Sequence, residues 1–317
     1  MASDYSGYLN VLKPTGMTSH DVVYYVRRHI RMKKVGHMGT LDPDAAGVLP
    51  LCIGKATRLA AYVQNETKEY RGEACFGIRT ASQDRSGERL SLALKEALNA
   101  QVNRDRLEEV FAKYEGILEQ TPPMVSAVKY QGKKLYEWAR AGKDVPRRPR
   151  RVRVFSLTLV DFYQDDDGYP RVLFDVVCSK GTYIRTLCAD MGETLGVGAH
   201  MSYLLRTKAG PFPIDKTVTL EELKNLAEKG DLAPVLYPLD YPLDGMLTVH
   251  LTNEQSESIV HGRSVRITDS ASFGEMADGK QLRLYSKQGQ FLAIGEKKDQ
   301  YIKPKKVFIE ETEHEND

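Results

Sequence analysis

The order of strand-like and helix-like segments constrains the fold of this 317-residue chain more than any other feature. Residues 70–78 place aromatic, small and apolar side chains at every second position, which is the period of a strand with one buried face. Residues 19–30 instead repeat valine and isoleucine at helical spacing. Such segments alternate irregularly along the chain. This order favours a mixed β-sheet in an α+β domain over a doubly wound parallel sheet.

The same patterns predict the other elements of this domain. Ser19 is the expected N-cap of the first helix, and Thr219 and Glu222 form a T-x-x-E capping box for the last one. The expected strands are residues 8–12 and a hairpin of 152–162 with 171–178, and the expected helices are 19–30, 56–63, 104–114, 182–195 and 219–229.

The pattern changes past about residue 245. Three prolines, Pro234, Pro238 and Pro242, mark a linker. A short helix near residues 253–261 is followed by short strand-like runs, which glycines such as Gly274 separate. These runs are residues 264–267, 282–285, 290–294 and 306–309. The segment predicts a small, β-rich appended domain.

Composition excludes several classes of protein. With 41% hydrophobic and 28% charged residues, the chain is typical of a globular protein, and no apolar run approaches the ~18 residues of a membrane span. No secretory signal is visible, so we expect a cytoplasmic protein with four buried, free cysteines. The histidines and cysteines have no metal-ligand spacing, and no nucleotide-binding motif occurs. We therefore expect neither a metal nor a cofactor.

Charge is concentrated in one segment. Residues 129–153 carry ten Lys or Arg against Glu137 and Asp144, an excess of eight positive charges, while residues 310–317 form an acidic tail. Such a basic segment is either a solvated loop or a surface for a polyanion. Its aromatic residues, Tyr130, Tyr136 and Trp138, suit a nucleic acid with unstacked bases.

A loop around Asp42 has the composition of a shaped, functional loop. Gly36 and Gly39 allow positive φ angles and the close approach of a ligand, and Pro43 disfavours the α conformation at Asp42. The loop therefore presents His37 and Asp42. Asp42 is either a helix-capping residue in a turn or a catalytic carboxylate, which needs no cofactor to act as nucleophile or general base. The residues alone indicate an RNA-binding protein and leave its catalytic activity open.

Four segments, taken together, resemble the TruB family of bacterial tRNA pseudouridine synthases. They are residues 11–19 (VLKPTGMTS), 36–58 (from GHMGTLDPDAAGVLP to GKATR), 68–72 (KEYRG), and 178–187 (CSKGTYIRTL) with the following GAH and LLRT. The resemblance covers roughly residues 8–240. More weakly, the C-terminal part resembles a PUA-type RNA-binding domain.

This resemblance implies a pseudouridine synthase fold, a mixed β-sheet flanked by helices, with a small PUA-like domain. It implies a catalytic domain of residues 1–245 with a basic insertion at about 124–152, a PUA-like domain at 246–310, and the acidic tail at 311–317. The implied reaction converts uridine to pseudouridine at position 55 of tRNA without a cofactor or metal. The implied partner is the T-arm stem-loop of tRNA, bound by a monomer.

The resemblance also implies roles for individual residues. Asp42 matches the essential aspartate, Arg185 its ion-pair partner, and Tyr70 the tyrosine that stacks on the target base and helps to remove a proton. The other matches are Tyr183 and Leu204 in the uracil pocket, His37 in the space left by the flipped base, and Lys13 and Pro14 in a supporting motif.

The basic segment corresponds in position to a family insertion that closes over the RNA. The residues expected to contact the RNA backbone are Lys129, Lys133, Lys134, Arg147, Arg148, Arg150 and Arg151. Two positions depart from the common pattern: Met38 stands where threonine is frequent, and Leu205 where arginine is frequent.

Three functions remain in competition at this stage. The first is a stand-alone pseudouridine synthase. The second is a non-catalytic factor that opens and refolds the tRNA elbow, and the third is a guide-RNA-dependent relative of the archaeal and eukaryotic type. The chain length and the basic insertion favour the stand-alone form.

Overall fold

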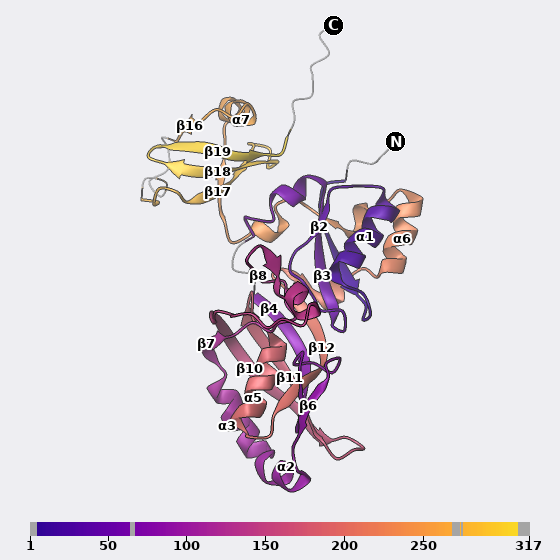
Figure 1. Ribbon diagram of the computed structural model, residues 1–317. Helices are drawn as coiled ribbons and strands as arrows, with labels where there is room; N and C mark the ends of the chain where they lie inside the picture. Colours follow the sequence, from indigo (N-terminus) through magenta and orange to yellow (C-terminus); the bar gives the residue numbers. More distant parts are fainter. Residues whose placement is uncertain (1–4, 64–66, 268–272, 274, 310–317) are drawn as a thin grey trace.

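A computed structural model describes residues 5–63, 67–267, 273 and 275–309 of the chain. Gly274 and the acidic tail therefore lie outside the described residues. The larger body contains one extended sheet with helices, and a smaller β-rich body follows it at the C-terminal end (Figure 1). Within the described ranges, no helix combines the length and the apolar character that a membrane span requires.

Ten described strands form one mixed sheet. Its main path runs β14-β1-β3-β12-β4-β11-β10-β7, with β13 beside β12 and β2 beside β3. The strands are β1 (Gly7–Lys13), β2 (Val35–His37), β3 (Ala46–Ile53), β4 (Thr67–Phe76), β7 (Gly116–Gln120), β10 (Arg150–Gln164), β11 (Pro170–Ser179), β12 (Ala199–Ala209), β13 (Phe212–Pro213) and β14 (Leu236–Tyr237). Only β3 and β12 pair in parallel among these strands. The predicted α+β class and mixed sheet are thus confirmed.

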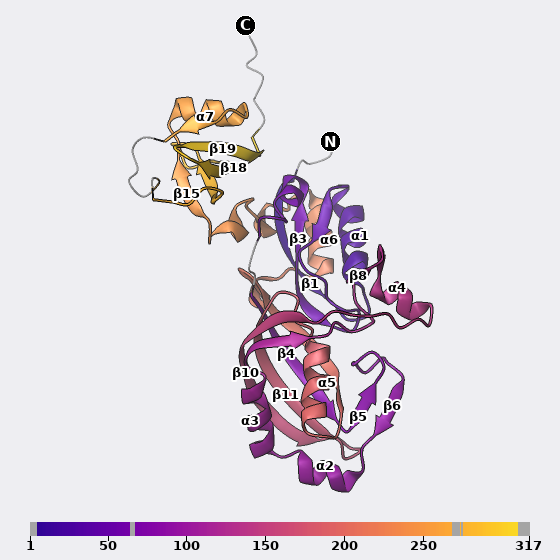
Figure 2. The ribbon, with the colours of Figure 1, turned by 60° about the vertical axis from the view of Figure 1, so that its left-hand side comes forward.

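Helices cover the sheet at two places, each with its own core. α3 (Arg104–Lys113) and α5 (Ile184–Thr194) pack on β4, β10, β11 and β12 (Figure 2). α1 (Ser19–Ile30) and α6 (Leu220–Lys229) pack on β1 and β3. The alternation predicted for residues 70–78 supplies Tyr70, Ala74 and Phe76 to the first core. Burial of such a side chain is worth about 1.5–3 kcal/mol, so the alternation fixes which face of the sheet the helices cover.

Shorter elements complete the larger body. They are α2 (Lys95–Gln101), α4 (Leu135–Arg140), β5 (Ile78–Thr80) paired with β6 (Arg89–Leu92), β8 (Lys129–Tyr130) paired with β9 (Lys133–Lys134), and the 3₁₀ helices η1 (Gly54–Arg58), η2 (Ile214–Lys216), η3 (Ala233–Val235) and η4 (Tyr241–Leu243). All four cysteines are buried and free, as predicted.

The capping predictions were correct for α6 and one residue off for α1. Thr219 caps α6 in a capping box with Glu222. At α1 the cap is Thr18, which forms the box with Asp21. Ser19 lies in the first turn of the helix, and its Oγ exchanges two hydrogen bonds with the backbone of Leu41. The shift of one residue therefore frees Ser19 to hold the loop that carries Asp42.

The helix predicted at residues 56–63 was wrong. The chain forms the 3₁₀ turn η1 and then irregular turns up to residue 63. Gly54 has a φ of +60°, and its Cα packs so closely on the carbonyl of Tyr5 that a Cβ would lie 2.2 Å from that oxygen. Lys55 N–H donates to Ser6 Oγ. These contacts to the segment before β1 hold the chain in a tight turn.

The C-terminal body is a sheet of β15 (Leu247–His250), β16 (Val265–Arg266), β17 (Gln281–Tyr285), β18 (Phe291–Lys298) and β19 (Tyr301–Val307), with α7 (Asn253–Val260) packed on it. The predicted β-rich character and the helix are confirmed. The last strand begins five residues earlier than expected, because Pro304 lies beside a register shift that interrupts the pattern of the strand.

Candidate active site

A cavity of about 290 Å³ opens where β4, β12, the Asp42 loop, the start of α5 and the base of the basic insertion meet. Its lining includes five of the predicted site residues, namely Asp42, Tyr70, Tyr183, Arg185 and Leu204. His37, Lys13 and Pro14 do not line it. The structure thus brings together residues that are up to 162 positions apart in the sequence, as the span from Asp42 to Leu204 shows.

An ion pair joins Asp42 and Arg185 at this cavity. Arg185 Nε lies 2.9 Å from Asp42 Oδ2, and Nη2 lies 3.3 Å from Oδ1. The Arg185 side chain is only 3% exposed, whereas the Asp42 side chain retains 36% exposure. Burial raises the pKa of Asp42, and the positive charge of Arg185 opposes this shift. The buried guanidinium of Arg185 therefore orients the accessible carboxylate of Asp42.

Three further groups fix the guanidinium of Arg185. Nη2 donates to the carbonyl of Val125 at 2.8 Å, Nη1 donates to the carbonyl of Ser82 at 3.0 Å, and Nη1 lies 3.6 Å from Asp84 Oδ2. The Asp84 carboxylate in turn accepts hydrogen bonds from the hydroxyls of Ser82 and Ser86. Asp84 could not be predicted from the sequence, because it lies in a loop without hydrophobic periodicity.

Lys13 supports the Asp42 loop from beneath. Its Nζ is fully buried and donates to the carbonyls of Pro14 (2.8 Å), Pro43 (3.2 Å) and Ala45 (2.6 Å). Burial lowers the pKa of Lys13 to about 8, although the nearby charges of Asp42 and Asp44 oppose the shift. Lys13 and Pro14 thus lie outside the cavity, and Lys13 holds the chain that follows Asp42.

Only one of the two glycines singled out in this loop needs to be glycine. Gly39 has a φ of +91°, and a Cβ there would lie 2.5 Å from Lys68 Nζ. Gly36 is extended within β2, and a Cβ there would meet no atom within 4 Å. Of the two glycines, Gly39 alone uses the positive φ angle that glycine allows.

Arg206 is a buried residue of the site that the sequence analysis did not single out. It is the largest fully buried side chain among the described residues. Its guanidinium donates to the carbonyls of Val48 (2.7 Å), Gly39 (3.2 Å) and Thr40 (3.4 Å). It therefore joins the segment before Asp42 to β3, whereas Lys13 contacts the segment after Asp42. The alternation along β12 could have indicated this residue, because it places Arg206 on the same buried face as Leu204.

Tyr70 forms a wall of the cavity. In the sheet register it stands opposite Arg206 on β12, and Leu204 stands opposite the adjacent Gly72. Burial raises the pKa of the Tyr70 phenol, while the charge of Arg206 opposes the shift. The phenol is therefore neutral at pH 7 and presents an aromatic ring beside Leu204.

Tyr183 is the N-cap residue of α5, and Gln120 at the end of β7 holds it in place. Gln120 Oε1 accepts a hydrogen bond from Tyr183 N–H at 2.9 Å, and its Nε2 donates to the Tyr183 carbonyl at 3.3 Å. Gln120 is itself buried. It connects the strand before the basic insertion to the start of the helix that carries Arg185.

His37 ends β2 and is partly buried. Burial lowers the pKa of its ring, so that the imidazole is neutral at pH 7. Its Nδ1 is a buried atom without a hydrogen-bond partner among the described residues. Met38, one of the two departures from the family pattern, packs in the apolar cluster around Tyr8, and Leu205 is partly buried opposite Arg71. Neither lines the cavity.

The basic insertion forms the hairpin β8–β9 followed by α4 (Figure 2). Its base supplies Ser126 and Ala127 to the lining. The hydroxyl of Ser126 is buried and has no hydrogen-bond partner among the described residues. None of the seven basic residues predicted to contact RNA lines the cavity, and all but Lys134 and Arg147 are classed as exposed. Arg147 donates to the carbonyl of Pro122, and Arg151 lies 3.8 Å from Glu119.

Comparisons with known proteins match this chain along most of its length. The family model "TruB family pseudouridylate synthase (N terminal domain)" matches residues 27–184, "tRNA pseudouridylate synthase B C-terminal domain" matches 185–244, and "Pseudouridine synthase II TruB, C-terminal" matches 248–308. Relatives named tRNA pseudouridine synthase B include that of Alkaliphilus oremlandii, which is 45% identical over 82% of this chain and 83% of its own. That of Halalkalibacterium halodurans is 41% identical over 96% of this chain and 98% of its own.

Solved structures share the fold. A chain from the structure of an H/ACA RNP bound to a substrate RNA containing 2'-deoxyuridine has a TM-score of 0.70 and 24% identity, covering 96% of this chain and 85% of that chain. A chain from the crystal structure of a Cbf5-Nop10-Gar1 complex has the same TM-score and coverage at 26% identity.

Proposed function

The chain belongs to the TruB family of pseudouridylate synthases, and from this membership we propose that its cavity isomerises uridine to pseudouridine at position 55 in the T-loop of tRNA. The chain is an enzyme, and its substrate is tRNA. The observation that carries the assignment of the site is the Asp42–Arg185 ion pair, which faces the cavity beside the ring of Tyr70.

The reaction needs no oxidant, reductant or added atom. The bond between N1 of uracil and C1' of ribose breaks, the base turns, and C5 bonds to C1'. The proton on C5 is then removed, and N1 gains a proton. An ionised Asp42 starts this sequence either by attacking C1' or by accepting a proton from the ribose. Both routes need a carboxylate that is charged, accessible and fixed in direction. Arg185 keeps Asp42 charged and oriented, and the Asp42 side chain is 36% exposed.

The walls of the cavity suit a flipped pyrimidine. Extrusion of a base costs a few kcal/mol, and stacking on an aromatic ring returns about 1–3 kcal/mol. Tyr70 offers such a ring, and Leu204 and Tyr183 offer further apolar surface. Because the Tyr70 phenol is neutral at pH 7, its oxygen can take the proton that leaves C5 only after it has lost its own proton, and the charge of Arg206 stabilises the phenolate that this forms.

This assignment gives each segment of the chain a role. In our proposal, residues 1–245 form the catalytic domain, the insertion at 124–152 closes over the T-arm, and residues 246–310 form a PUA-like RNA-binding domain. The exposed basic residues of the insertion would contact phosphates, while the acidic tail would not. One chain contains every group that the proposed chemistry uses, so we propose that it acts as a cytoplasmic monomer.

An Asp42→Asn variant tests the catalytic assignment against the alternative of an RNA-folding factor. We expect this variant to bind a T-arm stem-loop with unchanged affinity and to form no pseudouridine. Asp44→Asn, two residues along the same loop, serves as the matched control and should retain most activity. If Asp42→Asn formed pseudouridine at the normal rate, the catalytic assignment would be wrong.

A further inference from the structure

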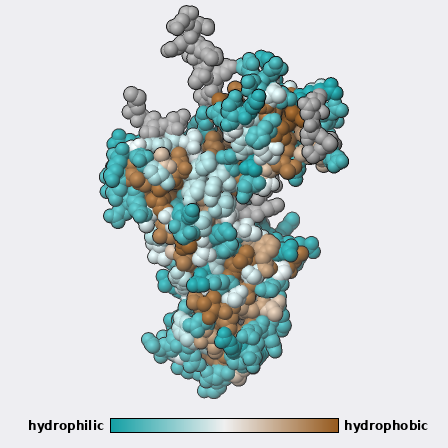
Figure 3. All heavy atoms as spheres, turned by 180° about the vertical axis from the view of Figure 1, so that it is seen from behind, coloured by the Kyte–Doolittle hydropathy of each residue, from teal (hydrophilic) through white to brown (hydrophobic). Residues whose placement is uncertain are grey.

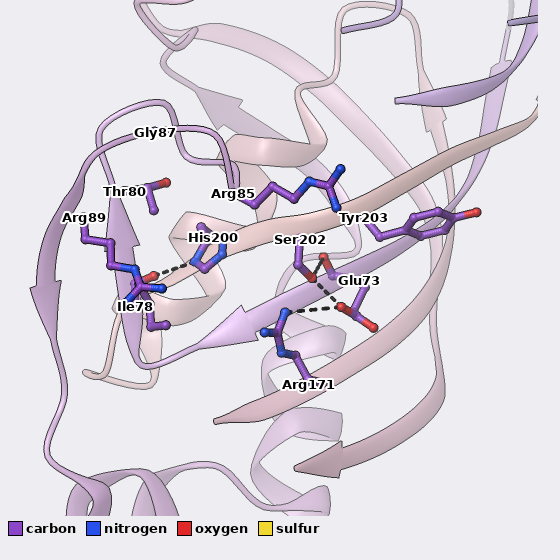
Figure 4. A pocket seen from close by; sticks show the side chains of 10 residues that line it. All are labelled: Glu73, Ile78, Thr80, Arg85, Gly87, Arg89, Arg171, His200, Ser202 and Tyr203. Atoms are coloured by element: carbon purple, nitrogen blue, oxygen red, sulfur yellow. Dashed lines mark hydrogen bonds and ion pairs between the residues drawn. The ribbon is translucent and has the colours of Figure 1, made fainter. Parts of the chain in front are cut away.

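A second cavity, of about 370 Å³, lies on the opposite face of the large sheet from α3 and α5 (Figure 4). Glu73 on β4 and Arg171 on β11 alternate with the core residues of these strands, so their side chains form its floor. His200 and Ser202 from β12 complete the floor, and Arg85 and Arg89 come from the β5–β6 hairpin that arches over it. Seen from behind, polar and apolar side chains are mixed over this part of the molecule (Figure 3).

The negative charge in this cavity is already neutralised. Glu73 accepts hydrogen bonds from Ser202 Oγ at 2.5 Å and from the hydroxyl of Tyr163 at 2.6 Å, and it lies 3.4 Å from Arg171 Nη1. Arg171 is also paired with Asp165 at 2.6 Å. The floor is therefore a closed network in which each charged group has its partner.

The two arginines of the arch have no such partner. Among the described residues, no ion pair or side-chain hydrogen bond involves the guanidinium of Arg85 or Arg89, and both are exposed. His200 beneath them is buried, and its Nδ1 donates to the carbonyl of Ile78 at 2.9 Å. Burial lowers the pKa of His200, the hydrogen bond to Ile78 and the charge of Asp84 oppose this shift, and the charges of Arg171 and Arg89 add to it. The cavity therefore has a positive potential that an anion would relieve.

The arch is also part of the active site. Arg85 follows Asp84, and its N–H donates to the carbonyl of Met201 at 3.0 Å. One residue earlier, Asp84 lies 3.6 Å from Arg185, which also donates to the carbonyl of Ser82. One short loop thus presents two free guanidinium groups on one side and holds the catalytic ion pair on the other. A ligand bound at Arg85 would therefore be held at a fixed position relative to Asp42.

We propose that this second cavity binds a backbone phosphate of the substrate RNA through Arg85 and Arg89. The inference rests on the proposed function, because it takes tRNA as the ligand. The forked guanidinium suits phosphate oxygens, and Tyr203 at the rim, 41% exposed, offers a ring on which an adjacent base can stack (Figure 4). This site lies apart from the basic insertion and gives the RNA a second anchor.

Binding of unmodified tRNA at several salt concentrations tests the proposal. An Arg85→Gln/Arg89→Gln variant should lower the slope of log K against log salt by about one unit, because one phosphate contact is lost. We expect its affinity to fall by roughly three- to tenfold at moderate salt. Arg85→Lys/Arg89→Lys keeps the charges and should retain most of the slope. Arg104→Gln/Lys113→Gln on α3 removes the same charge from the opposite face of the sheet and should change neither quantity.

Two results would overturn the proposal. One is a slope that is unchanged in Arg85→Gln/Arg89→Gln. The other is tight binding of pyrophosphate by the RNA-free wild-type protein, lost in this variant while tRNA affinity stays the same; the cavity would then serve a free phosphorylated ligand. Pseudouridine formation by the wild-type protein is measured in parallel. Its absence would contradict the proposed function, whereas its presence with an unchanged slope would contradict this inference alone.

Discussion

At the scale of single residues, the position of Arg185 explains how a charged pair can be both buried and reactive. Its guanidinium contacts groups from three separate segments, at Asp42, at Ser82 to Asp84, and at Val125. An arginine in so many contacts cannot turn away from Asp42. A buried cation of this kind is costly unless its partners are in place, so these contacts stabilise the site only as a set.

The pH dependence of activity should report the charge of Asp42. A carboxylate is ionised above its pKa, so activity should fall as the pH drops through that pKa, which burial places above the ordinary 3.8. Arg185→Met removes the opposing positive charge and should move this acid limb to a higher pH. Arg185→Lys keeps the charge and should leave the limb near its wild-type position while lowering kcat. Single-turnover rates from pH 4 to 8 measure both, and an unmoved limb in Arg185→Met would contradict this reading of the ion pair.

Ser126 should show opposite effects on stability and on activity. Its buried hydroxyl lines the active-site cavity without a partner among the described residues, and such a group is normally satisfied. Ser126→Ala should keep or raise the free energy of unfolding, by up to about 1 kcal/mol. It should also lower kcat/KM by about tenfold if the substrate supplies the missing hydrogen bond. Denaturant unfolding and steady-state kinetics check the two effects, and an unchanged kcat/KM would show that the hydroxyl has no substrate contact.

At the scale of elements, the sequence predicts most of the fold around the site but little of what joins its parts. The alternation at residues 70–78 placed Tyr70 on the buried face of β4, and Thr219 with Glu222 located the start of α6. Ser19, Gln120 and Asp84 could not be assigned in this way. Each is a polar residue whose partner lies on a distant segment, and no local pattern encodes such a pairing. The family resemblance supplied Tyr70, Arg185 and the catalytic role of Asp42, but the geometry of the three residues comes only from the fold.

Gln120 should matter because it links β7 to α5. Gln120 is buried and makes two hydrogen bonds to the backbone of Tyr183, so Gln120→Ala should cost about 1–3 kcal/mol of unfolding free energy. The variant should also lower kcat, because Arg185 lies two residues beyond Tyr183. Thermal unfolding and kinetics provide the measurement. Gln164→Ala removes a solvent-exposed hydrogen bond to Asn99 and is the control, expected to change neither; equal effects of the two variants would argue against the link.

At the scale of the whole molecule, the basic insertion should provide most of the salt dependence of RNA binding. Four of its exposed residues are replaced together in the variant that tests this, namely Lys129→Gln, Lys133→Gln, Arg148→Gln and Arg150→Gln. If each contacts one phosphate, the slope of log K against log salt should fall by about three. The kcat at saturating RNA should change little, because none of the four lines the active-site cavity. An unchanged slope would show that these four residues of the insertion do not contact RNA phosphates.

The C-terminal body contacts the larger body at η1. Lys55 Nζ donates to the carbonyl of Phe308, Arg58 Nη1 donates to that of Val307, and Leu59 packs in a cluster with Ile294 and Phe308. The turn at η1, where a helix was expected, is thus one of the contacts between the two bodies. Arg283 Nη2, which donates to the carbonyl of Asp244, adds another.

The central claim is that the cavity around Asp42 isomerises one uridine of tRNA, and site mapping tests it most directly. An unmodified tRNA transcript is incubated with the purified protein, and pseudouridine is located by chemical modification and primer extension. We expect one stoichiometric pseudouridine at position 55 with the wild-type protein and none with Asp42→Asn. A pseudouridine at another position, or none at all with a protein that binds the transcript, would contradict it.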